Sequence, residues 1–139
     1  MEKKQKKGDL GHWTTKLLTE GNEIPYGFIY LITNLTNNKK YIGKKQCKTV
    51  YKRPPLKGKK NKRHEIKETD WRTYTSSSRE LNDDIETLGK DKFKFEIIKF
   101  CDSKWTLAYE EAKIQFEEEV LLKDEYYNGI INLRIGKRK

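Results

Sequence analysis

Glu111 is the residue of this sequence whose surroundings most clearly call for a chemical partner. The region has a helical pattern, and at 100° per residue its neighbour Glu110 falls on a fully polar face. Glu111 instead falls among Leu107, Ala108 and Ile114. A carboxylate in that setting is partly desolvated and needs a metal ion, an arginine or a hydrogen-bonded network beside it. An ordinary, partly buried salt bridge is the simpler alternative.

Two tyrosines, Tyr30 and Tyr41, flank a run of turn residues and offer phenol groups for proton transfer. A two-residue turn at 35–36 would place them directly opposite one another, and one at 37–38 would pair Tyr41 with Asn34. Because Asn34 shares a face with Tyr30, either register points both phenols the same way. A phenol has a reference pKa of about 10, so it is a poor base at neutral pH unless cations lower that pKa.

The strands that would position these tyrosines form a β-hairpin over residues 26–45. Residues of opposite faces alternate from Phe28 to Thr33, turn residues follow, and a second β-prone run begins at Lys40. A further alternating run at 91–100 predicts a third strand that pairs with the hairpin. We therefore expect an α+β fold, in which a small three-stranded antiparallel sheet is flanked by helices.

Two helices are predicted, and both have recognisable ends. Ser77 and Glu80 form a capping box that opens a helix closed by Gly89. Ser103 caps a longer helix that runs to about Leu122. The main apolar stripe expected on this second helix consists of Trp105, Ala108, Ala112, Phe116 and Val120.

Length and composition favour one small domain with a large polar surface. The chain has 139 residues, of which 34% are hydrophobic and 37% charged, and its net charge is +10. This cationic surplus predicts a polyanionic partner, nucleic acid rather than a membrane. The sequence has no apparent signal core or membrane span. Cys47 and Cys101 lie far apart and form no CxxC pattern, which favours reduced thiols. We therefore expect a cytoplasmic protein, with the choice between monomer and homodimer left open.

Positive charge is concentrated in residues 39–67, which contain thirteen Lys or Arg and one acid. The net +12 exceeds the surplus of the whole chain, so the basicity is local. We expect a basic insert at about 44–67, and Pro54, Pro55 and Gly58 predict that its segment 52–67 is a loop. It would either contact phosphates or be ordinary solvated surface. Candidate nucleic-acid contacts are Lys45, Arg53, Lys57, Lys59, Lys60 and Lys62, together with Trp71 and Tyr74, for which core packing is the alternative.

The two ends of the chain are predicted to lie outside the sheet. Residues 1–25 are expected to form a basic N-terminal extension before a single domain at 26–139. This N-terminal extension would be a solubilising tail or would contact phosphates. Near the other end, Asn128 and Gly129 predict a turn, after which the extended residues 130–135 would pack on the core.

The order of these motifs resembles that of the GIY-YIG nuclease family. The two halves of the family signature appear as Phe28-Ile29-Tyr30 and Tyr41-Ile42-Gly43, with phenylalanine where the family name has glycine. The helix, the third strand and the glutamate helix follow in the family's order, so the resemblance covers about residues 26–128. The basic insert and the run from Trp71 to Ser77 are similar to those of small phage and mobile-element members.

This resemblance implies a metal-dependent phosphodiesterase that acts on DNA. Glu111 matches the glutamate that holds one divalent cation, Mg²⁺ or Mn²⁺, in the family. Tyr41, or else Tyr30, matches the tyrosine that is proposed to help deprotonate the attacking water. Lys44 is similar to a lysine in the motif of some members and would lower the phenol pKa.

The family's arginine is where this sequence departs from the pattern, because Tyr51 stands about ten residues after the second tyrosine. Arg72 is the favoured replacement and Arg63 the second, with Arg53 a further candidate. Many members carry a histidine or tyrosine one helical turn after that arginine. Ser76 stands at this place after Arg72, so either Tyr74 or His64 substitutes or Arg72 is not the family's arginine.

Asn128 resembles a late asparagine that supports the site in the family, and Asn132 is a less direct match. The resulting expectation is a DNA endonuclease of homing or phage type. The alternative is a non-catalytic basic protein that binds DNA or RNA on the same scaffold. The intact tyrosines and Glu111 favour the enzyme, whereas the displaced arginine favours the binding protein.

Overall fold

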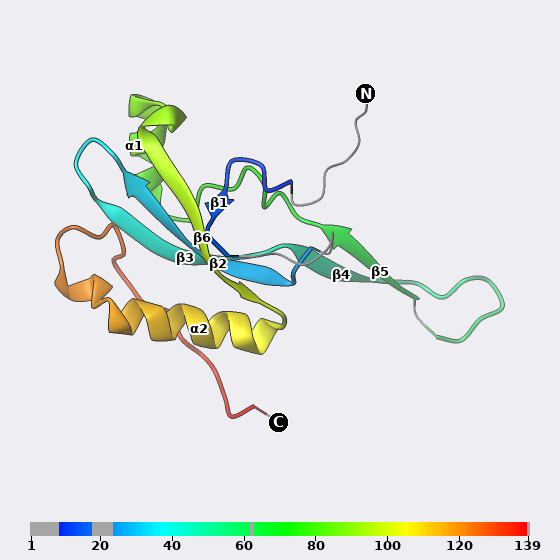
Figure 1. Ribbon diagram of the computed structural model, residues 1–139. Coiled ribbons are helices and arrows are strands. Elements are labelled where there is room, and N and C mark those ends of the chain that lie inside the picture. The colour runs from blue at the N-terminus through cyan, green and yellow to red at the C-terminus, as the bar shows by residue number, and fades with distance from the viewer. Residues whose placement is uncertain (1–8, 18–23, 62, 139) are drawn as a thin grey trace.

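The computed structural model describes residues 9–17, 24–61 and 63–138. Two helices and six strands follow one another along the chain, with a short 3₁₀ turn on either side of the last strand and helix (Figure 1). In order, they are β1 (Thr14–Thr15), β2 (Gly27–Asn34), β3 (Lys40–Gln46), β4 (Lys48–Arg53), β5 (Arg63–Glu68), α1 (Arg79–Leu88), η1 (Lys90–Lys92), β6 (Phe93–Cys101), α2 (Lys104–Glu117) and η2 (Val120–Leu122). Within these residues, neither helix is long enough and apolar enough to span a membrane.

The central sheet has the strand order β1-β6-β2-β3. Strand β2 is antiparallel to both β3 and β6, which confirms the predicted hairpin and its third strand. The α+β class is also confirmed. The sheet gains a fourth strand that was not predicted, because the two-residue β1 joins β6 in parallel. Strand β3 is left at the edge of the sheet.

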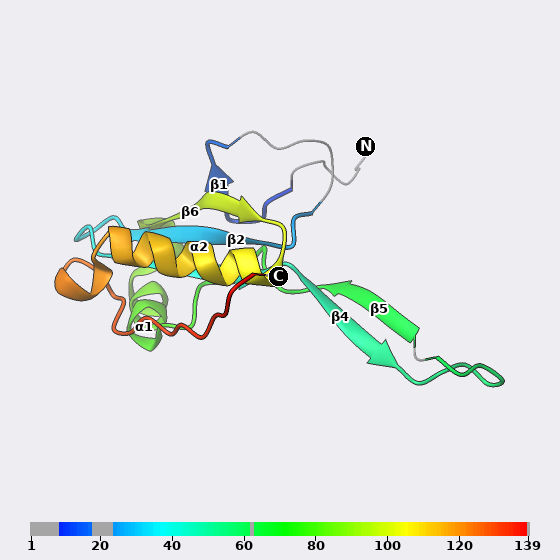
Figure 2. The same ribbon diagram turned by 90° about the horizontal axis from the view of Figure 1, so that it is seen from below.

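The sheet has a hydrophobic core on each face. Helix α2 covers one face, where Leu107 packs with Ile29 and Ile42 (Figures 1 and 2). On the other face, the buried cluster includes Trp13, Leu81 and the inward-pointing phenylalanines of β6. The alternation in β6 thus sorts its side chains between core and solvent, as a half-buried strand requires.

The turn of the first hairpin is longer than either predicted two-residue turn. Asn34 N donates to Lys39 O at 2.8 Å, and the side-chain oxygen of Asn34 accepts from Thr36 N at 2.9 Å. In this register Tyr30 pairs with Gly43, and Tyr41 pairs with Ile32. Both predicted registers were therefore wrong, but the shared face of the two tyrosines is confirmed.

The basic insert is largely a second hairpin, and the prediction of a loop throughout residues 52–67 was wrong. Strands β4 and β5 pair antiparallel from Lys48 opposite Glu68 to Arg53 opposite Arg63. This hairpin, called the basic arm below, projects away from the body of the protein (Figures 1 and 2). The proline and glycine turn residues are confined to its tip, and β-prone residues such as Val50 and Ile66 pair along it. Lys62 lies outside the described residues.

Residues 9–17 belong to the body of the protein, so the prediction of an N-terminal extension over residues 1–25 is corrected here. Trp13 is 3% exposed, and its indole N–H donates to Trp71 O at 2.6 Å. Burying so large an apolar ring against the sheet outweighs the polarity of the residues around it. Residues 1–8 and 18–23 lie outside the described part of the chain.

Both helices differ in detail from their predicted limits. Ser78, one residue later than expected, caps α1 by accepting from Leu81 N. Gly89 ends α1 as predicted, with φ +97°. Ser103 caps α2 as predicted, but α2 ends at Glu117 because Glu119 adopts a left-handed conformation before η2.

The buried face of α2 coincides only in part with the predicted apolar stripe, of which Ala112 is buried on the helix and Val120 just after it. Leu107, Ala112 and Gln115 are its buried residues, whereas Phe116 is 58% exposed. Trp105 instead stacks on Tyr109 at a ring distance of 4.9 Å. The polar residues that face the sheet make hydrogen bonds there, and a purely apolar pattern could not reveal that face.

Candidate active site

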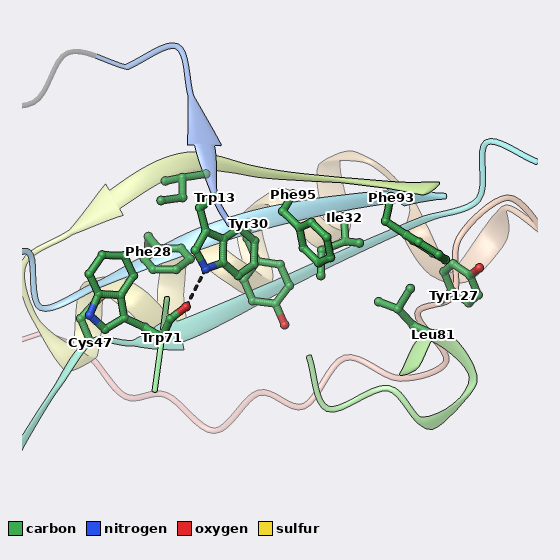
Figure 3. Close-up of a cluster of buried hydrophobic side chains, with 11 residues drawn as sticks. Trp13, Phe28, Tyr30, Ile32, Cys47, Trp71, Leu81, Phe93, Phe95 and Tyr127 are labelled. Carbon is green, nitrogen blue, oxygen red and sulfur yellow. Dashed lines mark hydrogen bonds between the residues drawn. The ribbon is translucent and has the colours of Figure 1, made fainter. Parts of the chain in front are cut away.

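Three tyrosines meet on the face of the sheet opposite α2. The ring of Tyr30, from β2, lies 6.2 Å from those of Tyr41 in β3 and Tyr74 in the segment after β5. Tyr30 is 1% exposed and lies beside Trp13 within the buried cluster (Figure 3). Tyr41 is less buried, and its hydroxyl lies 3.5 Å from that of Ser77.

Gly43, the last residue of the second motif, makes room for these phenols. A Cβ at this position would lie 2.6 Å from the Tyr30 hydroxyl and 2.9 Å from a ring carbon of Tyr41. Such distances are far below ordinary van der Waals contact. The motif therefore needs glycine for close approach, since the φ of Gly43 is not in the left-handed region.

The environment of the tyrosines keeps their hydroxyls protonated in the free protein. Burial raises the pKa of Tyr30 well above its ordinary value of 10.0. Burial also raises the pKa of Tyr41 and of Tyr74, and hydrogen bonding to Ser77 opposes that rise in both. None of the three phenols is a base at neutral pH without an additional cation.

Glu111 lies on the other side of the sheet, in the middle of α2. Its side chain is 15% exposed, and one oxygen lies 3.4 Å from Lys44 Nζ. Gln115 Nε2 donates to the other oxygen at 3.4 Å. Burial raises the pKa of Glu111, and the nearby ammonium of Lys44 opposes that rise. The partner of this carboxylate in the structure is therefore Lys44, which corresponds to the salt-bridge alternative.

The edge strand between these two groups is held by two buried amides. Asn128 Oδ1 accepts from Ile42 N at 3.0 Å, and Asn128 Nδ2 donates to Ile42 O at 2.8 Å. Gln115 Nε2 also donates to Ile42 O at 2.8 Å. These bonds satisfy backbone groups that an edge strand would otherwise leave unpaired. Asn128 thus fixes the backbone next to Tyr41 and Gly43.

Tyrosines and carboxylate act on each other across strand β3. Successive side chains of a strand point to opposite faces, so Tyr41 faces the tyrosine cluster and Lys44 faces α2. The charge of Glu111 nevertheless raises the pKa of both Tyr30 and Tyr41. The site is therefore built around an edge strand rather than inside a cleft between two walls.

The carboxylate of Glu111 also lines a cavity of about 370 Å³. Among the described residues, there is no group of three or more His, Cys, Asp or Glu that would enclose a metal ion. A single carboxylate still suits Mg²⁺ or Mn²⁺, because Mg²⁺ is commonly bound through one or two carboxylates, with waters and substrate phosphates completing its shell. The oxygen ligand and the open cavity fit such a cation.

The arginine candidates belong to the basic arm and to the segment that follows it. Arg72 pairs with Glu68 and Asp9 and lies over the ring of Trp71, so its guanidinium ties the start of the chain to the base of the arm. Arg53 and Arg63 are opposite each other in the last residue pair of strands β4 and β5, next to the tip of the basic arm. His64, next to Arg63, is exposed on the same arm.

The predicted nucleic-acid contacts are divided by the fold. Lys57, Lys59 and Lys60 are exposed near the tip of the arm. Trp71 is 2% exposed, so its role is core packing and its ring cannot stack on a base. Lys45 pairs with Asp70 at 2.9 Å and lies over the ring of Tyr74. Tyr74 itself joins the tyrosine cluster.

Three residues of the site were not identified from the sequence as parts of it. Ser77 was assigned to a helix cap, although its position in the Trp71 to Ser77 run was a signal. Gln115 follows Glu111 by one helical turn, and a polar pair on an apolar face could have indicated it. Gly43 was recognised only as a motif letter, since nothing local shows that a phenol lies against it.

Comparison with known proteins finds a matching family model. A family model described as "Putative endonuclease segE, GIY-YIG domain" matches residues 13–131, which is most of the chain. The match begins at Trp13 and therefore includes β1, in agreement with the burial of that residue. No curated protein and no solved structure matches the chain.

Proposed function

The chain belongs to the GIY-YIG nuclease family, and we propose that it is a DNA endonuclease that hydrolyses phosphodiester bonds with one divalent cation. The observation that carries the proposal is the position of Glu111 and the tyrosine pair on either side of one edge strand. The carboxylate is largely buried but opens on a cavity, and Tyr41 is the less buried of the two motif tyrosines.

Tyr41 is the phenol that we propose for contact with the attacking water. Its hydroxyl would orient that water by hydrogen bonding, and it would accept a proton only where cations lower its raised pKa. Tyr30 would hold the position of Tyr41 from behind, because it is buried and its hydroxyl packs on Gly43. Hydrolysis adds the water oxygen to phosphorus and breaks one P–O bond, so no other reactant is needed.

Glu111 would hold the divalent cation, Mg²⁺ or Mn²⁺. When bound, such a cation supplies positive charge that stabilises the phosphate in the transition state and the departing oxygen. Lys44 compensates the Glu111 carboxylate in the free protein and would have to release it for metal binding. Its ammonium would then be free to face the phosphate.

The basic arm supplies the DNA-binding part of the proposal. Each phosphate that a lysine neutralises releases counterions and strengthens binding, whatever the DNA sequence. The lysines near the tip are exposed and lie well away from the sheet, where they would reach DNA beyond the site of cleavage. The biological setting that we propose is a bacterial or phage-infected cytoplasm, with a homing or phage-encoded role.

Plasmid cleavage tests the proposal directly. The protein is incubated with supercoiled plasmid, with and without Mg²⁺, beside Glu111→Gln and Tyr41→Phe. We expect cleavage that requires Mg²⁺ and falls at least about 100-fold in each variant, as expected for loss of a metal ligand or an acid–base group.

Matched controls separate these roles from general damage. Glu117→Gln removes an exposed acid from the same helix, and Tyr109→Phe removes a half-exposed phenol. Both should cut at the original rate. Cleavage that persists in Glu111→Gln and Tyr41→Phe would indicate a contaminating nuclease, and binding without any cleavage would indicate the non-catalytic alternative.

A further inference from the structure

The cavity beside Glu111 has more positive charge than its own acid can balance. It lies between β3, the first turns of α2 and the chain at 132–134, and its volume is about 370 Å³. Four cations line it, namely Lys44, Lys45, Lys104 and Arg134, whereas Glu111 is the one acid among the described residues of its lining.

Two of these four cations have no acidic partner among the residues that the structure describes. Lys44 pairs with Glu111 at 3.4 Å, and Lys45 pairs with Asp70 at 2.9 Å. Within the described part of the chain, no acid lies within ion-pair distance of Lys104 or Arg134. Two uncompensated cations that line one cavity repel each other, and an anion between them would relieve that repulsion.

Arg134 is carried by a segment that is fastened to the protein on both sides of it. Ile131 packs against the core under α2, and Trp105 Nε1 donates to Gly136 O at 2.7 Å. Trp105 is itself stacked on Tyr109. We call residues 131–136 the C-terminal strap. Because the strap is held at Ile131 and Gly136, the fold places Arg134 at the cavity.

We propose that this cavity is a second phosphate site, which binds the DNA backbone phosphate next to the one that is cleaved. Arg134 would grip two phosphate oxygens with its planar fork, and Lys104 would add a point charge from the start of α2. The inference rests on the proposed function, because it takes Glu111, which lines the cavity, as the metal-binding residue. It extends that function by assigning two residues that no motif contains.

The test measures DNA binding without cleavage. In a Glu111→Gln background, the affinity for a short duplex is measured by fluorescence anisotropy over a range of salt concentrations. Neutralising one phosphate-bound cation should reduce the slope of log affinity against log salt by about 0.9. We expect that reduction for Lys104→Gln and for Arg134→Gln, and about twice that for the double variant.

Each variant has a control that carries the same charge outside the cavity. Lys113→Gln is the control for Lys104→Gln, because Lys113 lies on the exposed polar face of the same helix. Arg138→Gln is the control for Arg134→Gln, because Arg138 lies over Trp105 on the same terminal segment. Slopes that fall equally in the controls would show diffuse surface charge and would overturn the proposal. Circular dichroism of all five variants, the double variant included, establishes that they are folded.

The same duplex with single methylphosphonate linkages identifies the phosphate. After the cut is mapped, the penalty of Arg134→Gln should vanish only when the phosphate beside the cut is neutral. A penalty that persists at every linkage overturns the proposal. If the protein with Glu111 fails to cut but the slopes still change, the nuclease assignment fails and the phosphate site stands. If it cuts and the slopes match the controls, only the phosphate site fails.

Discussion

The ammonium of Lys44 lies 3.4 Å from a carboxylate oxygen of Glu111, and this ion pair joins the edge strand to the helix that covers it. The two side chains differ in exposure, since Glu111 is 15% and Lys44 is 42% exposed. A largely buried carboxylate without a partner costs stability, whereas the lysine can turn into water. The pair therefore compensates mainly for the burial of the glutamate.

A double-mutant cycle on this pair should show that asymmetry. Lys44→Met should lower the unfolding free energy, but should have little effect in a Glu111→Gln background. We expect a coupling of about 0.5–1 kcal/mol at low salt, because one partner is exposed. Denaturant titration of the four proteins measures it. Additive effects would mean that the ion pair contributes nothing in solution.

Gly43→Ala should distort the tyrosine cluster. The added methyl group would lie 2.6 Å from the Tyr30 hydroxyl, so we expect a loss of about 1–3 kcal/mol, typical of overpacking, together with a loss of cleavage. Gly129→Ala is the control, because a Cβ there meets no atom within 4 Å. Combining Gly43→Ala with Tyr30→Phe should recover part of the stability. Normal stability of Gly43→Ala alone would contradict this packing.

Asn128→Asp should weaken the edge strand. The amide group of Asn128 donates to Ile42 O, and an aspartate would place an acceptor oxygen there instead. The expected cost is about 1–3 kcal/mol for an unsatisfied buried polar group. Asn132→Asp serves as the matched control at the cavity rim. Thermal unfolding distinguishes the two variants, and equal midpoints would exclude the supporting role of Asn128.

His12 should make the protein sensitive to mild acid. Burial, followed by the charge of Lys90, lowers the pKa of His12 from 6.5 to about 4. Between these values the unfolded chain binds more protons than the folded one, so stability is lost as the pH falls from 6.5 towards 4. His12→Gln should flatten the Tm profile across that range. The exposed His64→Gln should leave it unchanged, and identical profiles for both variants would refute the assignment.

The basic arm should govern the salt dependence of DNA binding. Lys57, Lys59 and Lys60 are exposed near its tip, and Lys62 follows them in the sequence. Replacing all four with glutamine should lower the slope of log affinity against log salt by about 0.9 for each phosphate that a lysine no longer neutralises. Replacing Lys92, Lys99, Lys113 and Lys123, which are exposed elsewhere, removes the same charge and serves as the control. An unchanged slope would remove the arm from the interface.

Local sequence patterns were sufficient for much of the fold. The alternation in β2 and β6 and the caps at Ser103 and Gly89 depend on neighbouring residues, and the structure confirms them. The order of the motifs led to the family, which the family model confirms. Shared orientation of Tyr30 and Tyr41 also followed from strand periodicity, even though the predicted turn was wrong.

The contacts that complete the site could not be predicted, because they join residues far apart in the chain. Asn128 and Gln115 reach Ile42 across 86 and 73 residues, and Trp13 reaches Trp71 across 58. Arg72 looked like a catalytic candidate by position, yet Asp9, which the fold brings from far along the chain, engages it together with the nearby Glu68. The sequence alone therefore determined the strands, helix caps, charge and family. Only the tertiary structure decided which side chains meet at the edge strand, because periodicity sets the direction of a side chain but not its partner.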